Sequence, residues 1–326
     1  MIELMPRNVA HSLEQLDLRL DTPHEIPELQ KLLYETVLAG GKRFRPALCF
    51  LMGEILGVPG TECSPYARVA ELMHAATLAH DDVIDEATKR RNRPTLNHIA
   101  TNQKAVLTGD LLLARVVFEI AQKGNLEILR DGSQVLEDLV RGEWLQIDRR
   151  NQSQVNRARL EAAALKKTAS LIAWCCTTPA RLAGNEPVMV ERCRNFGNLV
   201  GLSFQMADDI LDFEKDGEKP YANDIREGLV NFVVLEMMER DPSTQPRIQK
   251  LLDDAADGRP LDWPWDDATL AAAKLGVRDK TRQMLEDARK ELAEISLHSP
   301  NPRADERQAA TEALDMILAM MAERMR

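Results

Sequence analysis

Aromatic residues are scarce in this chain of 326 residues, at 4% of the sequence. β-branched residues never gather into alternating runs of useful length, so the pattern argues against a fold built mainly of strands. Basic residues are outnumbered by acidic ones, 42 to 52, and the net charge is −10. This balance argues against binding nucleic acid or an anionic membrane through bulk charge.

Cysteines and apolar runs are limited in informative ways. The five cysteines show no paired metal-ligand spacing, their number is odd, and they lie in apolar, helical-looking contexts. We therefore expect reduced core thiols in a cytoplasmic protein, at Cys49, Cys63, Cys175, Cys176 and Cys193. No uncharged apolar run approaches the roughly 18–20 residues that a membrane span needs, so we expect no integral membrane segment. The first residues lack the basic-then-apolar pattern of a signal peptide.

A helical period runs along most of the chain instead. Ser64 and Pro65 predict the N-cap and first residue of a long helix that ends in acidic residues. Residues 257–267 predict a long surface loop, and residues 297–306 lead to a last amphipathic helix. We predict one all-α domain over residues 1–326, a bundle of roughly ten or more helices.

Two acidic clusters stand at the ends of apolar segments, in "HDDVIDE" and "ADDILDF". On a helix, Asp81 and Asp85 share a face, and so do Asp208 and Asp212. Like charges one turn apart repel, and the repulsion grows with burial, so something should offset it. Mg²⁺ prefers oxygen ligands and binds jointly with substrate phosphates. Two such clusters could therefore hold several Mg²⁺ ions on one diphosphate.

Simpler interpretations exist for each of these features. A single D-D-x-x-D is a solvated helix end about as often as it is a metal site. Two copies, each after an apolar helix, favour metal binding. General acid–base catalysis is a weaker interpretation, because neither cluster has an obvious nucleophile beside it. Cations that could bind a diphosphate occur in "GGKRFRP" and in "KRR" after the first cluster, and Arg suits bidentate phosphate contacts. Each alone is more often a solvated basic turn.

In order along the chain, these motifs resemble those of trans-isoprenyl diphosphate synthases of the long-chain type, the polyprenyl synthetase family. The matching segments are "GGKRFRP", "ELMHAATLAHDDVIDEATKRRNRPT", "GDLLLAR", "GEWLQ", "KKTASLIAWCC", "GLSFQMADDILDF" and "EKPYANDIREG". The resemblance is highly specific over residues 32–228 and loose beyond them. It implies an all-α fold of the isoprenoid synthase type, with helices around a deep central cavity, and a homodimer. It also implies a Mg²⁺-dependent transferase that joins isopentenyl diphosphate to an allylic diphosphate, head to tail (1′-4), giving an all-trans polyprenyl diphosphate.

The family's residue roles transfer to the matching positions of this chain. The aspartate motifs supply the catalytic residues Asp81, Asp82, Asp85, Asp208, Asp209 and Asp212, with Asp81, Asp85 and Asp208 as metal ligands. The isopentenyl diphosphate site is expected at Lys42, Arg45, His74 and Arg91, and the allylic diphosphate contacts at Arg90, Lys167 and Lys219. Thr168 and Gln205, which join Lys167 among the catalytic residues, are expected to line the reacting centre.

Product length follows from residues ahead of the first aspartate motif. In the implied mechanism, loss of diphosphate leaves an allylic carbocation, which the isopentenyl double bond attacks before a proton leaves. The growing tail should run along the helix before Asp81, where short-chain members of the family place an aromatic floor. Here Ala76 and Thr77 are small, so a long product is expected. Val117 and Phe118 in the next helix are candidate lower plugs.

The sequence departs from the family after the second aspartate motif. The family usually continues D-x-x-E-G-K-x-T-x-P, but this chain reads "DIREGLVNFVV", so Leu229 replaces a phosphate-binding Lys and Asn231 a Thr. Arg226 is a candidate replacement cation. Two alternatives stay open: a weakly active or non-catalytic regulatory subunit of a heteromeric synthase, and a terpene cyclase or head-to-head synthase. The intact aspartate motifs argue against the subunit, and His74 with "GGKRFRP" argues against the cyclase, which needs no isopentenyl site.

Overall fold

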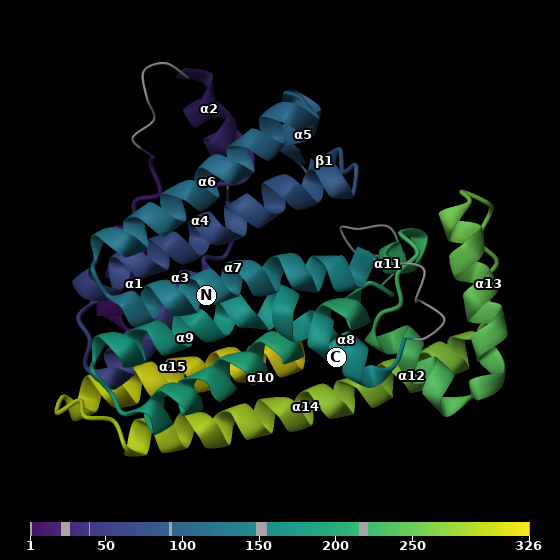
Figure 1. Ribbon diagram of the computed structural model, residues 1–326. Coiled ribbons are helices and arrows are strands. Elements are labelled where there is room, and N and C mark those ends of the chain that lie inside the picture. The colour runs from purple at the N-terminus through teal and green to yellow at the C-terminus, as the bar shows by residue number, and fades with distance from the viewer. Residues whose placement is uncertain are drawn as a thin grey trace. The chain divides into compact units, whose positions relative to one another are not determined.

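The computed structural model describes residues 2–20, 27–38, 40–90, 93–147, 155–214 and 221–325 (Figure 1). Within these ranges the regular structure is almost entirely helical. The strands found there are β1 (Lys89–Arg90) and β2 (Arg93–Pro94), a short antiparallel pair. The prediction of an all-α chain is therefore confirmed.

The helices follow one another with short connections along most of the chain. Their bounds are α1 (Arg7–Glu14), α2 (Pro27–Glu35), α3 (Phe44–Leu56), α4 (Gly60–Ile84), α5 (Leu96–Ile99), α6 (Asn102–Gln122), α7 (Leu126–Ile147), α8 (Arg157–Ala164), α9 (Ser170–Leu182), α10 (Pro187–Leu211), α11 (Asn223–Arg226), α12 (Phe232–Arg240), α13 (Gln245–Ala256), α14 (Asp267–Leu297) and α15 (Ala304–Glu323). A π-helical segment, Leu165–Ala169, joins α8 to α9, and 3₁₀ turns occur at Ile2–Leu4 and Pro242–Thr244. The loop before α14 and the last helix, α15, agree with the sequence-based expectations.

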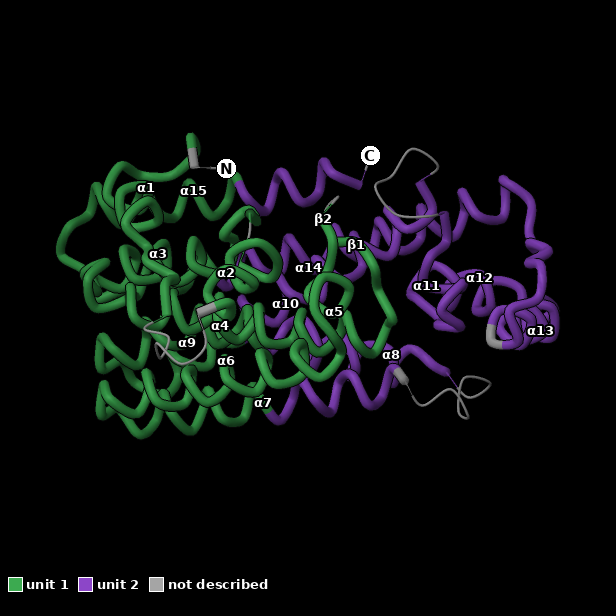
Figure 2. Tube along the Cα trace, turned by 90° about the horizontal axis from the view of Figure 1, so that it is seen from above, with its two compact units in different colours: residues 1–136, 171–194, 292–316 green, residues 137–170, 195–291, 317–326 purple. Residues whose placement is uncertain are grey.

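The chain divides into two compact units (Figure 2). Unit 1 contains residues 1–136, 171–194 and 292–316, and unit 2 contains residues 137–170, 195–291 and 317–326. Helices α7, α9, α10, α14 and α15 contribute residues to both. The single domain over residues 1–326 stays a prediction.

Unit 1 is built around α4, which packs against α3 and α6 (Figure 1). Trp174 of α9 is buried here and meets the ring of Tyr66 edge-on at 6.3 Å. The fully buried large side chains of α3 and α4 include Leu51, Met52, Ile55, Leu72 and Met73. Burying one such side chain stabilises a fold by about 1.5–3 kcal/mol, so this core fixes the position of the acidic end of α4.

The start of α4 differs from the sequence-based expectation. The helix begins at Gly60 with Pro59 as its N-cap, so the prediction that Ser64 caps it is wrong. Pro65 lies within the helix, where it cannot donate the hydrogen bond that residue 65 would give to the Thr61 carbonyl. Proline is common at the first position of a helix, but this helix extends more than one turn further back than Pro65.

Unit 2 contains a buried carboxylate on α12 with several cationic partners. Glu236 is 5% exposed and pairs with Arg157, Arg240 and Lys280 at 3.1, 3.0 and 2.6 Å. Burial raises the pKa of Glu236, but the hydrogen bonds and charges of Lys280 and Arg240 outweigh it, so the pKa lies below its ordinary value. The ionised form of Glu236 therefore holds α12 to α8 and α14.

Candidate active site

The first aspartate motif lies at the C-terminal end of α4. The helix ends at Ile84, and Asp85 is its C-cap. Asp82 is 2% exposed, whereas Asp81 is half-buried and Asp85 is exposed. The middle carboxylate therefore turns into the protein, and the two outer carboxylates occupy the more accessible face.

Asp82 is tied to the hairpin that follows α4. Its carboxylate accepts a hydrogen bond from Nε of Arg90 at 2.8 Å. The side-chain amide of Asn97 donates to the carbonyls of Asp82 and Ala87 at 3.0 and 3.1 Å. Burial raises the pKa of Asp82, and Arg90 offsets only part of the rise. The structure thus places Arg90 beside the motif, and it gives Asp82 internal partners that the sequence did not indicate.

The basic turn before α3 is fastened to α4. Arg43 has a φ of 49°, in the left-handed region, and its Nη1 lies 2.7 Å from the carboxylate of Glu71. Lys42 beside it is exposed, and Arg45 and His74 are half-buried. The Arg43–Glu71 pair therefore holds the turn that carries Lys42 to the helix that carries His74.

The predicted length-determining residues lie in different surroundings. Ala76 has no exposed surface, whereas Thr77 is half-buried and donates to the carbonyl of His74 at 2.9 Å. Val117 and Phe118 are 42% and 50% exposed on α6. This exposure contradicts their role as lower plugs within the single chain, because the face of α6 that carries them points outward.

The second aspartate motif ends α10 in unit 2, and its three carboxylates also differ. Asp208 is half-buried, whereas Asp209 and Asp212 are buried. The Asp212 carboxylate accepts hydrogen bonds from the backbone N–H groups of Asn223 and Asp224, at 3.0 and 3.2 Å. Asp212 therefore anchors α11 to the end of α10, and Asp208 is the most accessible carboxylate of the three.

Lys167 and Thr168 lie in the π-helical segment Leu165–Ala169. Two glycines of neighbouring helices approach its backbone. A Cβ on Gly142 of α7 would come within 2.5 Å of the Lys167 nitrogen, and one on Gly201 of α10 within 2.4 Å of the Ala169 Cα. Single π turns within helices occur frequently at functional sites. The two glycines allow α7 and α10 to hold this segment closely from two sides.

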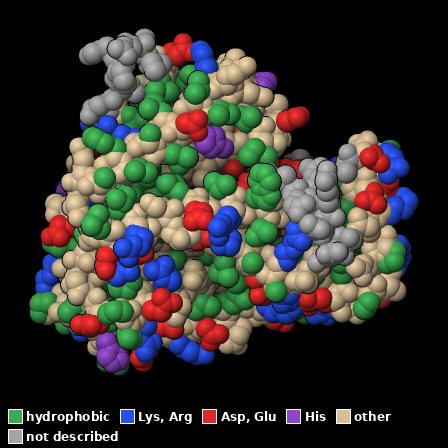
Figure 3. Space-filling model, viewed as in Figure 1, with side chains coloured by type: hydrophobic (Ala, Val, Ile, Leu, Met, Phe, Trp, Pro, Cys, Tyr) green, Lys and Arg blue, Asp and Glu red, His purple; other side chains and the backbone are tan. Residues whose placement is uncertain are grey.

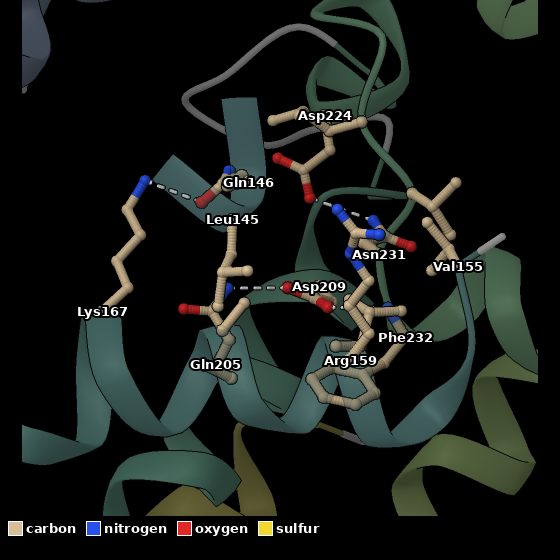
Figure 4. Close-up of a pocket in the computed structure, with 15 residues that line it drawn as sticks. Leu145, Gln146, Val155, Arg159, Lys167, Gln205, Asp209, Asp224, Asn231 and Phe232 are labelled. Carbon is tan, nitrogen blue, oxygen red and sulfur yellow. Dashed lines mark hydrogen bonds between the residues drawn. The ribbon is translucent and has the colours of Figure 1, made fainter. Parts of the chain in front are cut away.

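Hydrogen bonds connect this segment to the second aspartate motif, and Figure 4 shows the one between Gln205 and Asp209. Thr168 Oγ1 donates to Gln205 Oε1 at 2.7 Å, and Gln205 Nε2 donates to Asp209 Oδ1 at 2.9 Å. The other Asp209 oxygen accepts the N–H of Phe232, at 2.8 Å, which begins α12. Burial raises the pKa of Asp209 well above its ordinary range, and the nearby Asp224 carboxylate adds to the rise. The chain thus brings Thr168, Gln205 and Asp209 together, and the role of Thr168 and Gln205 at the reacting centre stays a prediction.

Gln205 and Asp209 also border a pocket of about 100 Å³ in unit 2 (Figure 4). Its lining comes from α7, α8, the π-helical segment, α10 and the chain around α11 and α12, and includes Gln146, Arg159, Lys167, Gln205, Asp209, Asp224, Leu229 and Asn231. Lys167 Nζ lies 2.8 Å from the oxygen of Gln146 and 2.5 Å from the carboxylate of Glu143. Leu229 contributes an apolar side chain to the wall, where the family usually has a lysine.

Asn231, the second departure from the family pattern, has a clear structural role. Its Oδ1 accepts the N–H of Val234 at 3.1 Å and caps α12, and its Nδ2 donates to Asp224 at 3.0 Å. The residue is 4% exposed. Asn231 therefore supports both α12 and the acidic side of the pocket.

Comparison with known proteins decides the family. The family model for polyprenyl synthetase matches residues 26–260 of the chain. The chain belongs to the polyprenyl synthetase family. Octaprenyl diphosphate synthase of Escherichia coli (strain K12) is 30% identical over 297 residues, which cover 90% of this chain and 89% of that protein.

The mammalian relatives match a shorter part. All trans-polyprenyl-diphosphate synthase PDSS1 of Mus musculus is 37% identical over 220 residues, which cover 64% of this chain. The match spans 54% of the length of that mouse protein and 56% of its Homo sapiens counterpart. The chain thus corresponds to just over half of these two relatives.

Solved structures confirm the fold of this chain. Decaprenyl diphosphate synthase from Rhodobacter capsulatus has a TM-score of 0.81 at 25% identity, covering 98% of this chain and 96% of that chain. A polyprenyl synthase from Caulobacter crescentus CB15, complexed with calcium and isoprenyl diphosphate, has a TM-score of 0.79 at 25% identity and covers 98% of both chains. The isoprenoid synthase type of fold is therefore confirmed.

The carboxylates of the two motifs fit a hard divalent cation. Asp81 and Asp85 present carboxylate oxygens one turn apart at the accessible end of α4. Asp208 presents its carboxylate near the end of α10. Mg²⁺ takes one or two carboxylates and completes its shell with waters and phosphates. Among the described residues, no three His, Cys, Asp or Glu side chains lie close enough to hold a metal ion by themselves.

Sequence reasoning assigns no role to three residues that line the pocket. Arg159 belongs to no recognised motif, whereas Gln146 and Asp224 lie in the matching segments "GEWLQ" and "EKPYANDIREG". Arg91 and Lys219 lie outside the described residues.

Proposed function

We propose that this polyprenyl synthetase condenses isopentenyl diphosphate with an allylic diphosphate, head to tail, to give a long-chain all-trans polyprenyl diphosphate. The observation that carries the proposal is the pair of aspartate motifs, each at the C-terminal end of a long helix and each with its most accessible carboxylate facing away from the core. The E. coli and R. capsulatus relatives are named octaprenyl and decaprenyl diphosphate synthases, which supports a long product.

Mg²⁺ is part of this proposal. Asp81 and Asp85 of the first motif, and Asp208 of the second, would each hold Mg²⁺ together with waters and diphosphate oxygens. When bound, it supplies electrostatic stabilisation of the departing diphosphate. The C. crescentus relative, whose structure contains calcium and isoprenyl diphosphate, supports a divalent cation in this role.

The other residues position and neutralise the substrates. Lys167 places an ammonium group at the pocket, where it would bind allylic diphosphate oxygens, and Arg90 would do so from the hairpin fixed by Asp82. Thr168 is held by Gln205, so its hydroxyl has a defined position at the reacting centre. Lys42, Arg45 and His74, with Arg91, would bind isopentenyl diphosphate. Buried Asp209 and Asp212 position α12 and α11.

We further propose a homodimer. Leu107, Leu111 and Phe118 recur at helical spacing on α6 and are 66%, 37% and 50% exposed. Figure 3 shows hydrophobic side chains on the face of the molecule where α6 lies in Figure 1. Contiguous exposed apolar residues of this kind mark interaction surfaces. Light scattering of the purified chain should give the mass of a dimer, and Leu107→Glu should shift it toward the monomer.

A cytoplasmic location completes the proposal. All five cysteines are buried free thiols, and burial raises the pKa of Cys175 to about 12. Free thiols are typical of a reducing compartment. Separately, none of the described helices has both the length and the apolar composition that crossing a membrane requires.

One incubation separates the proposed function from its alternatives. The purified chain is given labelled isopentenyl diphosphate, an allylic diphosphate primer and Mg²⁺. We expect the chain alone to place the label in long-chain prenyl products. Incorporation only after a second protein is added would identify a regulatory subunit. Cyclic hydrocarbon formed from the allylic diphosphate alone would identify a cyclase.

A further inference from the structure

The pocket in unit 2 contains a guanidinium that no recognised motif assigns. Arg159, Ala163 and Lys167 recur every four residues along α8 and the π-helical segment, so all three face the same way, and all three line the pocket. Figure 4 shows Arg159 and Lys167 extending from this segment toward the pocket. Ala163 lies between them in the sequence and contributes only a small side chain to the lining.

The two arginines of α8 serve different purposes. Arg157 pairs with Glu236 at 3.1 Å and with Glu239, and it does not line the pocket. Arg159 lies two residues further on, about 200° around the helix, and lines the same pocket as Leu229. The helix thus places one arginine in a structural ion-pair network and the other at the pocket.

The acidic residues at the pocket are engaged with other donors. Asp209 accepts hydrogen bonds from Gln205 and from the N–H of Phe232, and Asp224 accepts one from Asn231. These contacts turn carboxylate oxygens toward neutral donors of the protein. The pocket therefore combines carboxylates that accept hydrogen bonds from neutral groups of the protein with two cationic side chains in its described lining, Arg159 and Lys167.

Arg226, the replacement cation suggested by the sequence, lies elsewhere. Its Nε donates to the carbonyl of Tyr221 at 2.9 Å, and its guanidinium lies 5.6 Å from the ring centre of Trp263. Arg226 is absent from the pocket lining, and the cationic side chains among the described lining residues are Arg159 and Lys167. The structure therefore favours Arg159 over Arg226.

We propose that Arg159 binds the diphosphate of the allylic substrate and supplies the positive charge that Leu229 does not. This inference rests on the proposed function, because the allylic diphosphate is the ligand assigned to this pocket. A guanidinium presents a planar fork of donors that matches phosphate oxygens in pairs. Arg159 and Lys167 would then contact the diphosphate from two positions on one helical face.

The first test compares Arg159→Gln with Arg157→Gln, a matched control that removes a cation from the same helix outside the pocket. Loss of a charge-assisted phosphate contact lowers affinity about 10- to 100-fold. We expect Arg159→Gln to raise KM for the allylic diphosphate by that factor and to leave KM for isopentenyl diphosphate unchanged. Titration calorimetry with inorganic pyrophosphate and Mg²⁺ should show a parallel loss, whereas Arg157→Gln should bind pyrophosphate like wild type.

A second pair of variants tests whether a cation at residue 229 can replace the cation at residue 159. Leu229→Lys should lower the raised KM for the allylic diphosphate in the Arg159→Gln protein most of the way back to the wild-type value. In the wild-type background it should change this KM little. An equal gain in both backgrounds would overturn the inference, as would wild-type pyrophosphate binding by a folded Arg159→Gln protein. If Arg159→Gln does not fold, Arg159→Lys, which keeps the charge but loses the fork, should still weaken pyrophosphate binding. Absent condensation by wild type would refute the proposed function, while the pyrophosphate titration would still decide the role of Arg159.

Discussion

Replacing Gly201 with alanine tests the close approach between α10 and the π-helical segment. The added Cβ would lie 2.4 Å from the Ala169 Cα and 2.5 Å from its Cβ. Carbon atoms in contact normally lie about 3.5–4.0 Å apart, so the two backbones must separate by about 1 Å. Overpacking costs about 1–3 kcal/mol, and the better helix propensity of alanine returns about 0.8–1 kcal/mol. The two ranges leave a net loss of about 0–2 kcal/mol. We expect a value in the upper half of this range, because the opposing atoms belong to the backbone and to a Cβ, which cannot rotate away.

The same displacement should reach the reacting centre. Gln205 lies one turn after Gly201 and accepts the Thr168 hydroxyl at 2.7 Å. A separation of about 1 Å would take this contact beyond hydrogen-bonding range. We therefore expect Gly201→Ala to lower kcat in addition to the urea midpoint.

Gly132→Ala provides the control, because that helical glycine meets the flexible end of Ile120 at 3.1 Å. It should match wild type or gain slightly in stability. Wild-type stability and wild-type kcat in Gly201→Ala would refute the close approach.

Three further changes follow from the structure. Asn231→Ala removes the α12 cap and should lower the free energy of unfolding by about 1 kcal/mol in urea titrations, whereas Asn231→Ser should recover most of it; an unchanged midpoint would contradict the capping role. Because folding lowers the pKa of Glu236, its ionised carboxylate stabilises the fold at pH values above the ordinary pKa of 4.5. This stabilisation is lost as the pH falls through the lower pKa of the folded state. Glu236→Gln should therefore be less stable than wild type at pH 7, with a gap in urea midpoint that narrows below pH 4.5; a constant gap would exclude this linkage. Thr77→Tyr should shorten the products seen by chromatography while condensation continues. An unchanged product ladder would show that the growing tail does not pass this half-buried residue. Thr77 is chosen over Ala76 because Ala76 is fully buried and would accept an aromatic ring only with overpacking.

The helical period predicted the fold and the location of the acidic clusters. Residues four apart share a helix face whatever surrounds them, so the pairing of Asp81 with Asp85 needed no tertiary information. The motif order added the family, and with it the grouping of Thr168 and Gln205. Both features depend on local spacing or on a long ordered series of motifs.

Other parts of the site depend on contacts that spacing does not determine. Adjacent residues on a helix point about 100° apart, so the burial of Asp82 and Asp209 depends on which neighbours pack there. Arg90 reaches Asp82 only because a two-stranded hairpin turns the chain back. The π turn before α9 inserts an extra residue, which changes the face that later residues present. Arg159 belongs to no motif, and its direction follows from how α8 is packed.

The most direct test of the central claim is the metal dependence of condensation by the purified chain. The account predicts that long-chain product forms with Mg²⁺ and disappears with EDTA. It also predicts that Asp81→Ala and Asp208→Ala each lose several orders of magnitude in rate at saturating Mg²⁺, while circular dichroism shows that both variants remain folded. Near-normal turnover by either variant, or turnover that persists in EDTA, would contradict the role given to the aspartate motifs.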